Sequence, residues 1–165
     1  MAVEVRLADL DLADLDLSDT SAFAGWAMAE EVLRRMAADG FGDVRVHDGV
    51  VFQHVLAGPL SITELAGRMG VTQQAASKSV ADLERRGLLA RRPSDTDGRT
   101  RLLHLSERGE RAVRAGRRHR AALDAELAAA LGERRVREAR ALLADVLTHL
   151  GAVDAVRARR IRPPA

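Results

Sequence analysis

Residues 72–86 carry side chains whose types and spacing suit hydrogen bonding to bases. Ala76, Val80 and Leu83 recur at steps of four and three, which places them on one face of a helix. The opposite face is polar, small-featured and nearly free of acids: Gln73, Gln74, Ser77, Lys78 and Ala81. Glutamine can pair with adenine, lysine with guanine and serine with either, and a helix amino terminus, here at Thr72, attracts phosphate. We expect Thr72 and this face to contact double-stranded DNA; the alternative is an ordinary solvated face.

A second stretch, residues 91–106, combines arginines with an acidic turn. Asp95 and Asp97 are turn formers whose carboxylates accept hydrogen bonds from nearby backbone N–H groups, and Gly98 can adopt a positive φ. Asp97 can also hold the guanidinium of Arg99 extended toward the minor groove of DNA, where negative potential favours an arginine. The alternative is a surface turn with an incidental ion pair.

Four further arginines flank these features: Arg85, Arg86, Arg91 and Arg92. From residue 68 to residue 120 the chain has 14 Lys and Arg against 6 Asp and Glu, although its net charge is only +2. We expect the four to contact DNA phosphates, which provide affinity and salt dependence without sequence information. Solvated surface charge is the alternative. The arginines of residues 108–120 alternate with acids and are interpreted as scaffold charge.

The composition restricts the fold and the compartment. Of 165 residues, 47% are hydrophobic and only 2% aromatic, so the core must consist of Leu, Val and Ala, which favours packed helices. The absence of cysteine excludes disulfides and thiol redox sensing and suits a reducing cytoplasm. No apolar run approaches the roughly 18 residues that span a bilayer, and no signal pattern opens the chain. We expect a mainly helical, cytoplasmic protein without a membrane partner.

Residues for catalysis or metal binding form no convincing pattern. His47 and His54 are seven residues apart, so on a helix they are separated by about 10.5 Å, too far for one metal ion. The sequence has neither a Gly-rich phosphate loop nor a nucleophile with a plausible base. We therefore expect no enzymatic activity, no metal and no cofactor.

The elements that position these residues follow from local signals. Ser18 or Thr20 can cap a first long helix that ends at Gly40, and a second helix is expected over residues 44–57. After Ser106, which can cap a third long helix, a final helix carries apolar residues at alternating steps of three and four. That stripe is too regular to face water.

The middle of the chain predicts two short helices joined by a turn. Ser61 and Glu64 form a capping box, in which the serine oxygen accepts from a backbone N–H and the glutamate reaches back. Gly70 ends this helix, Thr72 caps the next one and Gly87 ends it. Two short helices separated by a glycine-containing turn form a helix-turn-helix.

A two-stranded hairpin follows the helix-turn-helix. Residues 88–90 and 101–105 are extended runs on either side of a polar turn. A hairpin in this position is a wing. The wing residues expected to contact DNA are Arg91, Arg92, Asp97 and Arg99.

The middle of the chain resembles the winged helix-turn-helix of MarR-type bacterial transcriptional regulators, over the stretch SITELAGRMGVTQQAASKSVADLERRGLLARRPSDTDGRTRLLHLSERG. The family has a D-x-R wing tip and a leucine-(Ser/Thr) pair that starts a long helix. Here these are Asp97-Gly98-Arg99 and Leu105-Ser106. The resemblance implies a homodimer whose first, fifth and sixth helices interlock, a palindromic operator, and often a small phenolic or other aromatic effector between the dimer arm and the DNA-binding lobe.

The expected organisation has five parts. Residues 1–18 form an acidic extension that contains LADLD twice, residues 19–42 a dimerisation helix, residues 43–106 the winged helix-turn-helix lobe, residues 107–158 long C-terminal dimerisation helices, and residues 159–165 a tail. The apolar stripes of the terminal helices favour a homodimer independently of the resemblance. Two-fold symmetry would place the recognition helices roughly 34 Å apart on a pseudo-palindrome.

Four residues are candidates for lining an effector site: Trp26, Arg45, His47 and Phe52. The aromatic rings supply apolar walls, the histidine an orienting group and the arginine a partner for an anion. The alternatives are core packing for Trp26 and solvation for Arg45. The predicted function is a DNA-binding transcriptional repressor that a small aromatic or anionic ligand releases. The alternatives are a winged-helix module that binds protein, and an architectural DNA-binding protein without an effector.

Overall fold

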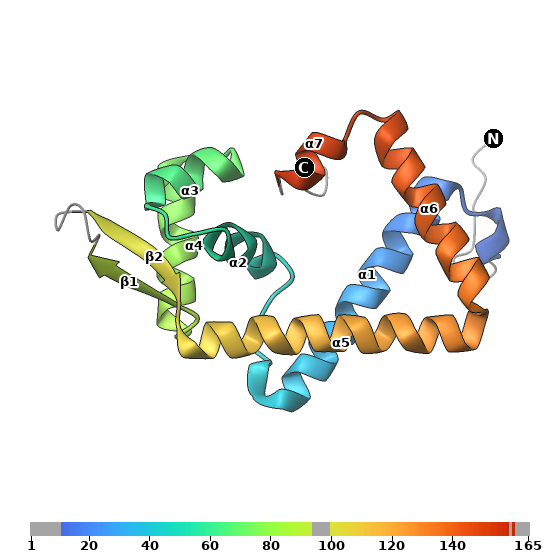
Figure 1. Ribbon diagram of the computed structural model, residues 1–165, viewed down its shortest axis with the longest axis horizontal. Coiled ribbons are helices and arrows are strands. Elements are labelled where there is room, and N and C mark those ends of the chain that lie inside the picture. Colours follow the sequence, from blue (N-terminus) through green and yellow to red (C-terminus); the bar gives the residue numbers. More distant parts are fainter. Residues whose placement is uncertain (1–10, 94–99, 159, 161–165) are drawn as a thin grey trace, which may run out of the picture.

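The computed structural model describes residues 11–93, 100–158 and 160. These residues are mainly helical, with one two-stranded antiparallel sheet, as the composition and local signals predict. In Figure 1, α5 runs along one side of the molecule, with the hairpin at its N-terminal end and α6 at its C-terminal end. The elements in chain order are η2 (Leu12–Asp14), α1 (Leu17–Met36), η3 (Ala37–Phe41), α2 (Asp48–Leu56), α3 (Ile62–Met69), α4 (Gln73–Arg85), β1 (Leu89–Pro93), β2 (Arg101–Leu105), α5 (Glu107–Leu131), α6 (Glu133–His149) and α7 (Val153–Arg157).

The helix-turn-helix consists of α3 and α4, and the predicted capping box is confirmed. The backbone N–H of Ser61 donates to Glu64 Oε2 at 2.7 Å, and the N–H of Glu64 donates to Ser61 Oγ at 3.3 Å. The hydrogen bonds from Ser61 hold the pKa of Glu64 below its usual value. Gly70 ends α3 with a left-handed φ of 62°, and Thr72 caps α4. Local side chains therefore determine the turn between the helices.

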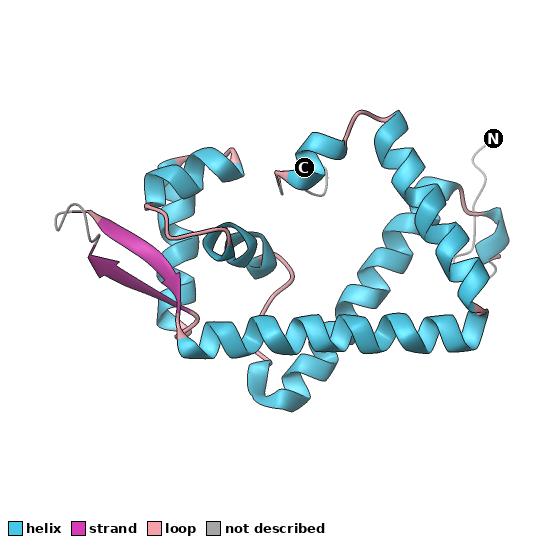
Figure 2. Cartoon of the chain, in the orientation of Figure 1, coloured by secondary structure: helices cyan, strands magenta, loops and turns pink. Residues whose placement is uncertain are grey.

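The wing is the hairpin of β1 and β2 (Figure 2). Its antiparallel register places Leu89 opposite Leu105. The N–H of Leu103 donates to the carbonyl of Leu60 at 2.8 Å, and both of these leucines are completely buried. The base of the wing is therefore attached to the residues that precede α3.

The joint between the wing and α5 is tightly packed. Ser106 caps α5 by accepting a hydrogen bond from the N–H of Gly109 at 2.9 Å, and its own N–H donates to the carbonyl of Leu88 at 3.2 Å. A side chain at position 109 would overlap the carbonyl oxygen of Leu88, so glycine is required there. Close backbone contacts therefore hold the wing and α5 together.

The hydrophobic core fills the lobe of α2, α3, α4 and the wing, and reaches Val32 and Met36 on α1. Five leucines of the lobe are almost completely buried: Leu60, Leu65, Leu83, Leu88 and Leu103. By contrast, α6 has no buried residue, and its Leu142 and Leu143 are exposed. The part of the chain that the structure describes has no helix long and apolar enough to cross a membrane.

The first long helix begins earlier than the sequence predicts. Asp16, rather than Ser18 or Thr20, caps α1, because its Oδ1 accepts a hydrogen bond from the N–H of Asp19 at 2.9 Å. This bond also lowers the pKa of Asp16. The second LADLD unit therefore ends in a helix cap, so part of the predicted acidic extension has regular structure.

The second helix, α2, begins later than predicted, at Asp48. The side chain of Asp48 accepts a hydrogen bond from the backbone N–H of Arg45 at 2.8 Å, which holds the residues before α2 in a turn. Asp48 is only 1% exposed. A carboxylate buried this deeply requires cationic partners, and they come from the end of α4.

Candidate nucleic-acid interface

Helix α4 separates a buried apolar face from an open polar face. Ala76, Val80 and Leu83 lie in the core, as their spacing predicts. The opposite face forms a shallow groove of about 520 Å³, lined by Gln73, Gln74, Ser77, Lys78 and Ala81. The groove therefore presents amide, hydroxyl and ammonium groups together, and no acidic side chain lines it.

The N-terminal end of α4 borders this groove. Thr72 Oγ1 accepts a hydrogen bond from the N–H of Ala75 at 3.2 Å, which caps the helix and leaves the hydroxyl proton for another acceptor. The first turn of α4 contains no acid. The positive end of the helix dipole is therefore not neutralised by a neighbouring carboxylate.

Of the wing arginines predicted to contact DNA, Arg91 and Arg92 are described, and they differ in their contacts. Arg91 Nη2 lies 2.8 Å from Glu84 Oε2, and its Nε donates to Glu84 Oε1 at 2.9 Å, so α4 fixes the direction of this guanidinium. Arg92 is exposed and makes no ion pair with any residue that the structure describes. Asp97 and Arg99, the predicted tip residues, lie outside the described residues.

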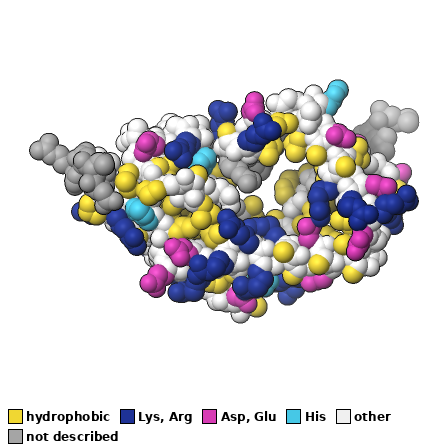
Figure 3. All heavy atoms as spheres, in the orientation of Figure 1, with side chains coloured by type: hydrophobic (Ala, Val, Ile, Leu, Met, Phe, Trp, Pro, Cys, Tyr) yellow, Lys and Arg dark blue, Asp and Glu magenta, His cyan; other side chains and the backbone are white. Residues whose placement is uncertain are grey.

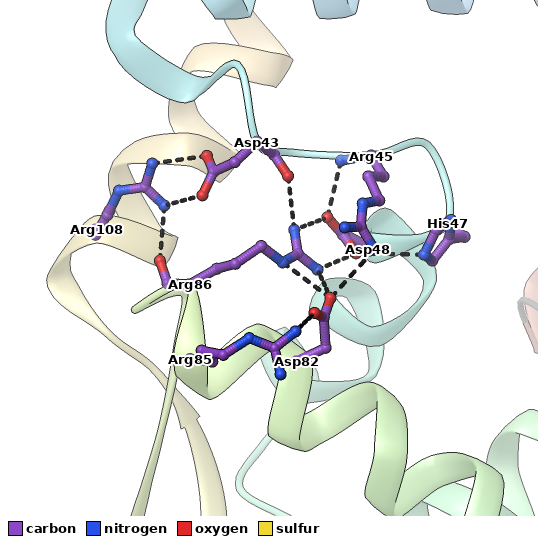
Figure 4. A network of polar contacts seen from close by, with 8 residues as sticks. All are labelled: Asp43, Arg45, His47, Asp48, Asp82, Arg85, Arg86 and Arg108. Carbon is purple, nitrogen blue, oxygen red and sulfur yellow. Dashed lines mark hydrogen bonds and ion pairs between the residues drawn. The ribbon is translucent and has the colours of Figure 1, made fainter.

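The two arginines at the C-terminal end of α4 have opposite environments (Figure 4). The side chain of Arg86 is only 10% exposed and lies 2.7 Å from both Asp48 Oδ2 and Asp82 Oδ2. Hydrogen bonding to Asp48 is the largest cause of its raised pKa. Because its guanidinium is engaged inside the protein, Arg86 is not presented to a phosphate, which corrects the expectation from the sequence. Arg85 also pairs with Asp82, but its side chain is 73% exposed.

Further polar contacts connect the end of α4 to two other elements. Arg108 on α5 donates to Asp43 Oδ1 at 2.7 Å and to the carbonyl of Arg86 at 2.9 Å. Its hydrogen bonds hold the pKa of Asp43 below the usual range. Arg45 Nη1 lies 3.3 Å from Asp82 Oδ2. The end of α4 is therefore fastened both to α5 and to the segment before α2, as Figure 4 shows.

A cavity of about 630 Å³ lies between α1, α5, α2 and the segment before α2. Arg45 and Arg120 bring positive charge to this cavity, and the acid in its lining, Asp124, pairs with Arg140 at 2.9 Å. The arrangement suits an apolar molecule with an anionic group. The apolar side chains of the lining include Met28, Val32, Leu33, Met36, Phe52, Val113, Leu123 and Leu127.

The structure brings together only part of the predicted effector site. Arg45 and Phe52 line the cavity, whereas Trp26 and His47 do not. Trp26 is 59% exposed and meets the ring of Phe23 edge-on, with 5.4 Å between ring centroids. The other face of α1, which contains the buried Val32 and Met36, lines the cavity instead.

Arg120 is a lining residue that the interpretation of α5 as scaffold charge misses. The available signal is its spacing from Val113 and Gly116, which places the three on one helix face at steps of three and four. Both Val113 and Gly116 are buried and line the same cavity. This spacing places Arg120, which is itself exposed, at the edge of the cavity.

The family model of the MarR family matches residues 50–100, which include α3, α4 and β1. No curated protein matches the sequence. The match therefore covers the helix-turn-helix and the start of the wing.

Solved structures share the fold over most of the chain. The YusO protein of Bacillus subtilis is 26% identical, with a TM-score of 0.63 over 82% of this chain and 94% of that chain. The Mycobacterium tuberculosis MarR family protein Rv2887, in complex with salicylic acid, is 27% identical, with a TM-score of 0.54 over 82% and 99%. A mutant of S. aureus MepR bound to an oligodeoxyribonucleotide is 19% identical, with a TM-score of 0.59 over 83% and 99%.

The family model, the fold and the geometry of α4 agree. The capping box, the turn at Gly70 and the wing lie within or next to the matched segment, and the flanking helices have counterparts in the solved structures. The helix-turn-helix and the start of the wing match the model of the MarR family, and the chain is similar over most of its length to a solved MarR family protein.

Proposed function

We propose that the protein is a homodimeric repressor that binds a pseudo-palindromic operator through α4 and the wing and leaves it when a small ligand fills the cavity between α1 and α5. The observation that carries the proposal is the polar groove of α4, which no acid lines, on a helix whose other face is buried. A solvent-exposed helix with no partner to bind has no need of such a groove.

The groove residues match the hydrogen-bonding groups of the major groove. An α-helix fits the major groove of B-DNA, where Lys78 can bind guanine, and Gln73 or Gln74 can pair with adenine. Arg85 and Arg92 are exposed at the two sides of the helix-turn-helix and would contact phosphates. Arg99 would enter the minor groove from the wing.

The homodimer is supported by the apolar side chains that a single chain leaves exposed. They gather on α1 and α6, which lie at the same end of the molecule (Figure 1). Exposed apolar patches of this kind mark interaction surfaces, and a symmetric partner would bury them. The exposed large side chains of these helices are Leu17, Phe23, Trp26, Met28, Leu142 and Leu143.

Ligand release is supported by the position of Arg45. This residue lines the cavity and also lies 3.3 Å from Asp82 on α4. An anion in the cavity would compete with Asp82 for the guanidinium of Arg45. Loss of the Arg45–Asp82 ion pair would loosen the C-terminal end of α4 and so change the direction of this helix. The salicylic acid complex of Rv2887 supports an aromatic acid as the ligand class.

Selection of bound sites from random duplexes tests the DNA-binding part of the proposal. We expect a two-fold symmetric site that the protein binds at least about 1,000 times more tightly than random duplex at the same salt concentration. Fluorescence anisotropy of labelled duplexes measures both affinities. Equal affinity for selected and random duplexes would support the architectural alternative, and no salt-sensitive association would exclude DNA as the target.

Displacement by salicylate tests the ligand part. We expect salicylate to lower operator affinity, and Arg45→Gln to raise the concentration required for half release about tenfold, because one charged hydrogen bond to the anion is lost. Arg111→Gln, an exposed arginine of α5 outside the cavity lining, is the matched control. Equal release in both variants would remove the proposed role of Arg45.

A further inference from the structure

A cleft that is separate from the effector cavity and from the α4 groove lies between the lobe and the C-terminal helix α7. Its volume is about 420 Å³. Three arginines line it: Arg68 in the last turn of α3, Arg157 in α7 and Arg160 just after α7. The side chains of Gln53 and His54 on α2 complete its polar lining, and no acid lines it among the residues that the structure describes. We call this site the basic cleft.

A reversal of the chain after α6 brings α7 to the lobe. Gly151 has a φ of 64°, and the N–H of Ala152 donates to the carbonyl of Leu147 at 2.9 Å, so the chain turns sharply between the two helices. In Figure 1, α7 lies between the end of α6 and the lobe of α2 and α3. Arg157 and Arg160 thereby reach the same cleft as Arg68, from which they are distant in the sequence.

Helix α7 presents different side chains from α6. Helix α6 leaves Leu142 and Leu143 exposed, as expected of a helix that packs on a partner chain. In α7, Val153 and Val156 are half-buried, and no large apolar side chain of the described part of this helix is exposed. The side chain of Arg157 is 77% exposed. The surface of α7 therefore suits a charged partner rather than an apolar one.

The arginines of the basic cleft are not neutralised within the protein. Neither Arg68 nor Arg160 makes an ion pair with a residue that the structure describes. Arg157 lies 3.6 Å from Asp154, but both side chains are exposed, and such a pair contributes little. Residues 157–162 contain four arginines and no acid, so this end of the chain is strongly basic. Like charges that face one another repel, and an anion between them would remove the repulsion.

The basic cleft lies next to the N-terminal end of α4. Arg68 is four residues before Thr72, the cap of α4. The N–H of Val71 donates to the carbonyl of Ala66 at 3.0 Å, which closes the turn between the two helices. A helix in the major groove has the phosphates of both strands beside it. A cation at this end of α4 is therefore well placed to meet the DNA backbone.

We propose that α7 is a second DNA-contacting element, in which Arg157 and Arg160 act with Arg68 to bind the sugar-phosphate backbone beside α4. The proposal rests on the proposed operator binding and extends it to a helix that lies within the range expected from the sequence to form the dimer. Guanidinium groups pair with phosphate oxygens through parallel hydrogen bonds. Because backbone contacts carry no sequence information, α7 adds affinity and salt dependence without changing the preferred bases.

The test removes both α7 arginines from the full-length protein, as Arg157→Gln with Arg160→Gln. Each phosphate contact contributes about 0.9 to the slope of log affinity against log salt concentration, so we expect this slope to fall by about 1.8. The ratio of operator to random-duplex affinity should stay the same. The matched control, Arg134→Gln with Arg137→Gln, removes the same charge from exposed positions of α6 and should leave the slope unchanged. Anisotropy titrations at several salt concentrations measure all of these values.

Three results would overturn the proposal. A full slope in the α7 variant, with wild type binding the operator normally, would leave operator binding intact and exclude only the role of α7. A full slope together with a saturating shift of the His54 imidazole NMR signal by tripolyphosphate, lost in the variant, would make the cleft a site for a free phosphorylated molecule. A smaller sedimentation coefficient of the variant would make α7 part of the dimer interface. If wild type shows no salt-sensitive association with DNA, the proposed function fails as well.

Discussion

The two ends of α4 are built in opposite ways. Its N-terminal half presents Gln73, Gln74 and Lys78 in an open groove, and the structure gives these side chains no hydrogen bond or ion pair with the residues that it describes. Its C-terminal end places Arg86 between Asp48 and Asp82 in a nearly closed network. In the space-filling view of Figure 3, side chains of both charge signs are scattered over the visible face. Counting charges therefore does not distinguish the two ends of α4, whereas the hydrogen bonds and ion pairs of each side chain do.

This difference shows how one short helix can be held rigidly and still present polar side chains to a binding partner. The ion-pair network at the C-terminal end restricts the direction of α4. The polar side chains of the N-terminal half are therefore not needed to hold the helix in place and remain without internal partners. Preorganisation of this kind reduces the entropy that binding must overcome. Four substitutions test whether the two ends are as separate as this interpretation requires.

The largest effect is expected from Asp48→Asn, which breaks the closed end. Arg86 would keep only Asp82 as an ionised partner in a site where its side chain is 10% exposed. We expect the free energy of unfolding to fall by about 3 kcal/mol, because a buried cation loses its best partner. Urea denaturation measures it. Asp43→Asn, at a carboxylate that is 39% exposed, is the control and should cost less than about 1 kcal/mol. Equal losses would mean that burial of the pair is unimportant.

Lys78→Ala tests the open end. We expect the free energy of unfolding to change by less than about 0.5 kcal/mol, because the side chain has no described partner. Discrimination between the selected operator and a duplex with its contacted guanine replaced should fall by about 1–3 kcal/mol. Competition binding with the two duplexes measures this loss. Unchanged discrimination would place the base contacts elsewhere.

A smaller effect is expected from Arg85→Ala, at the exposed side of the C-terminal end of α4. Because the Arg85 side chain is 73% exposed, we expect it to contact a phosphate. Its removal should lower the slope of log affinity against log salt concentration by about 0.9, without a change in sequence preference. Anisotropy titrations at several salt concentrations measure the slope. A full-size slope would mean that Arg85, like Arg86, is used only within the protein.

The smallest effect concerns pH. The hydrogen bond from Arg108 lowers the pKa of Asp43 from its usual 3.8, so this carboxylate favours the folded state when it is charged. Its contribution is fully present above about pH 4 and is lost as the pH falls through the lower folded pKa. The difference in unfolding free energy between wild type and Asp43→Asn should therefore shrink from pH 7 to pH 3. Gln74→Ala, in the open groove, should give the same difference at both pH values.

The sequence predicts features that neighbouring residues determine. The capping box of Ser61 and Glu64 and the caps at Thr72 and Ser106 each join residues three positions apart, so the pattern contains all the information that the structure uses. The buried face of α4 follows equally from helical periodicity. The cap of α1 is the exception, because several polar residues near Asp16 could serve and the local pattern does not choose among them.

Features that depend on distant contacts are not predictable in this way. Arg86 and Asp48 are 38 positions apart, and nothing in the local pattern distinguishes Arg86 from the exposed Arg85 beside it. The prediction that Trp26 lines the effector site is wrong for a related reason. Both faces of α1 carry apolar residues, and only the crossing with α5 determines that Val32 and Met36 are buried while Trp26 is exposed.

The glycine at position 109 has a mechanical consequence. Because the backbone of α5 contacts the carbonyl of Leu88 there, the hairpin is packed rigidly against one end of a helix of 25 residues. Such a helix is about 37 Å long, so pivoting it by 5° displaces its far end by roughly 3 Å. Hydrogen bonds tolerate only a few tenths of an ångström. A modest hinge motion at the C-terminal end of α5 would therefore displace the wing by many times the tolerance of a hydrogen bond.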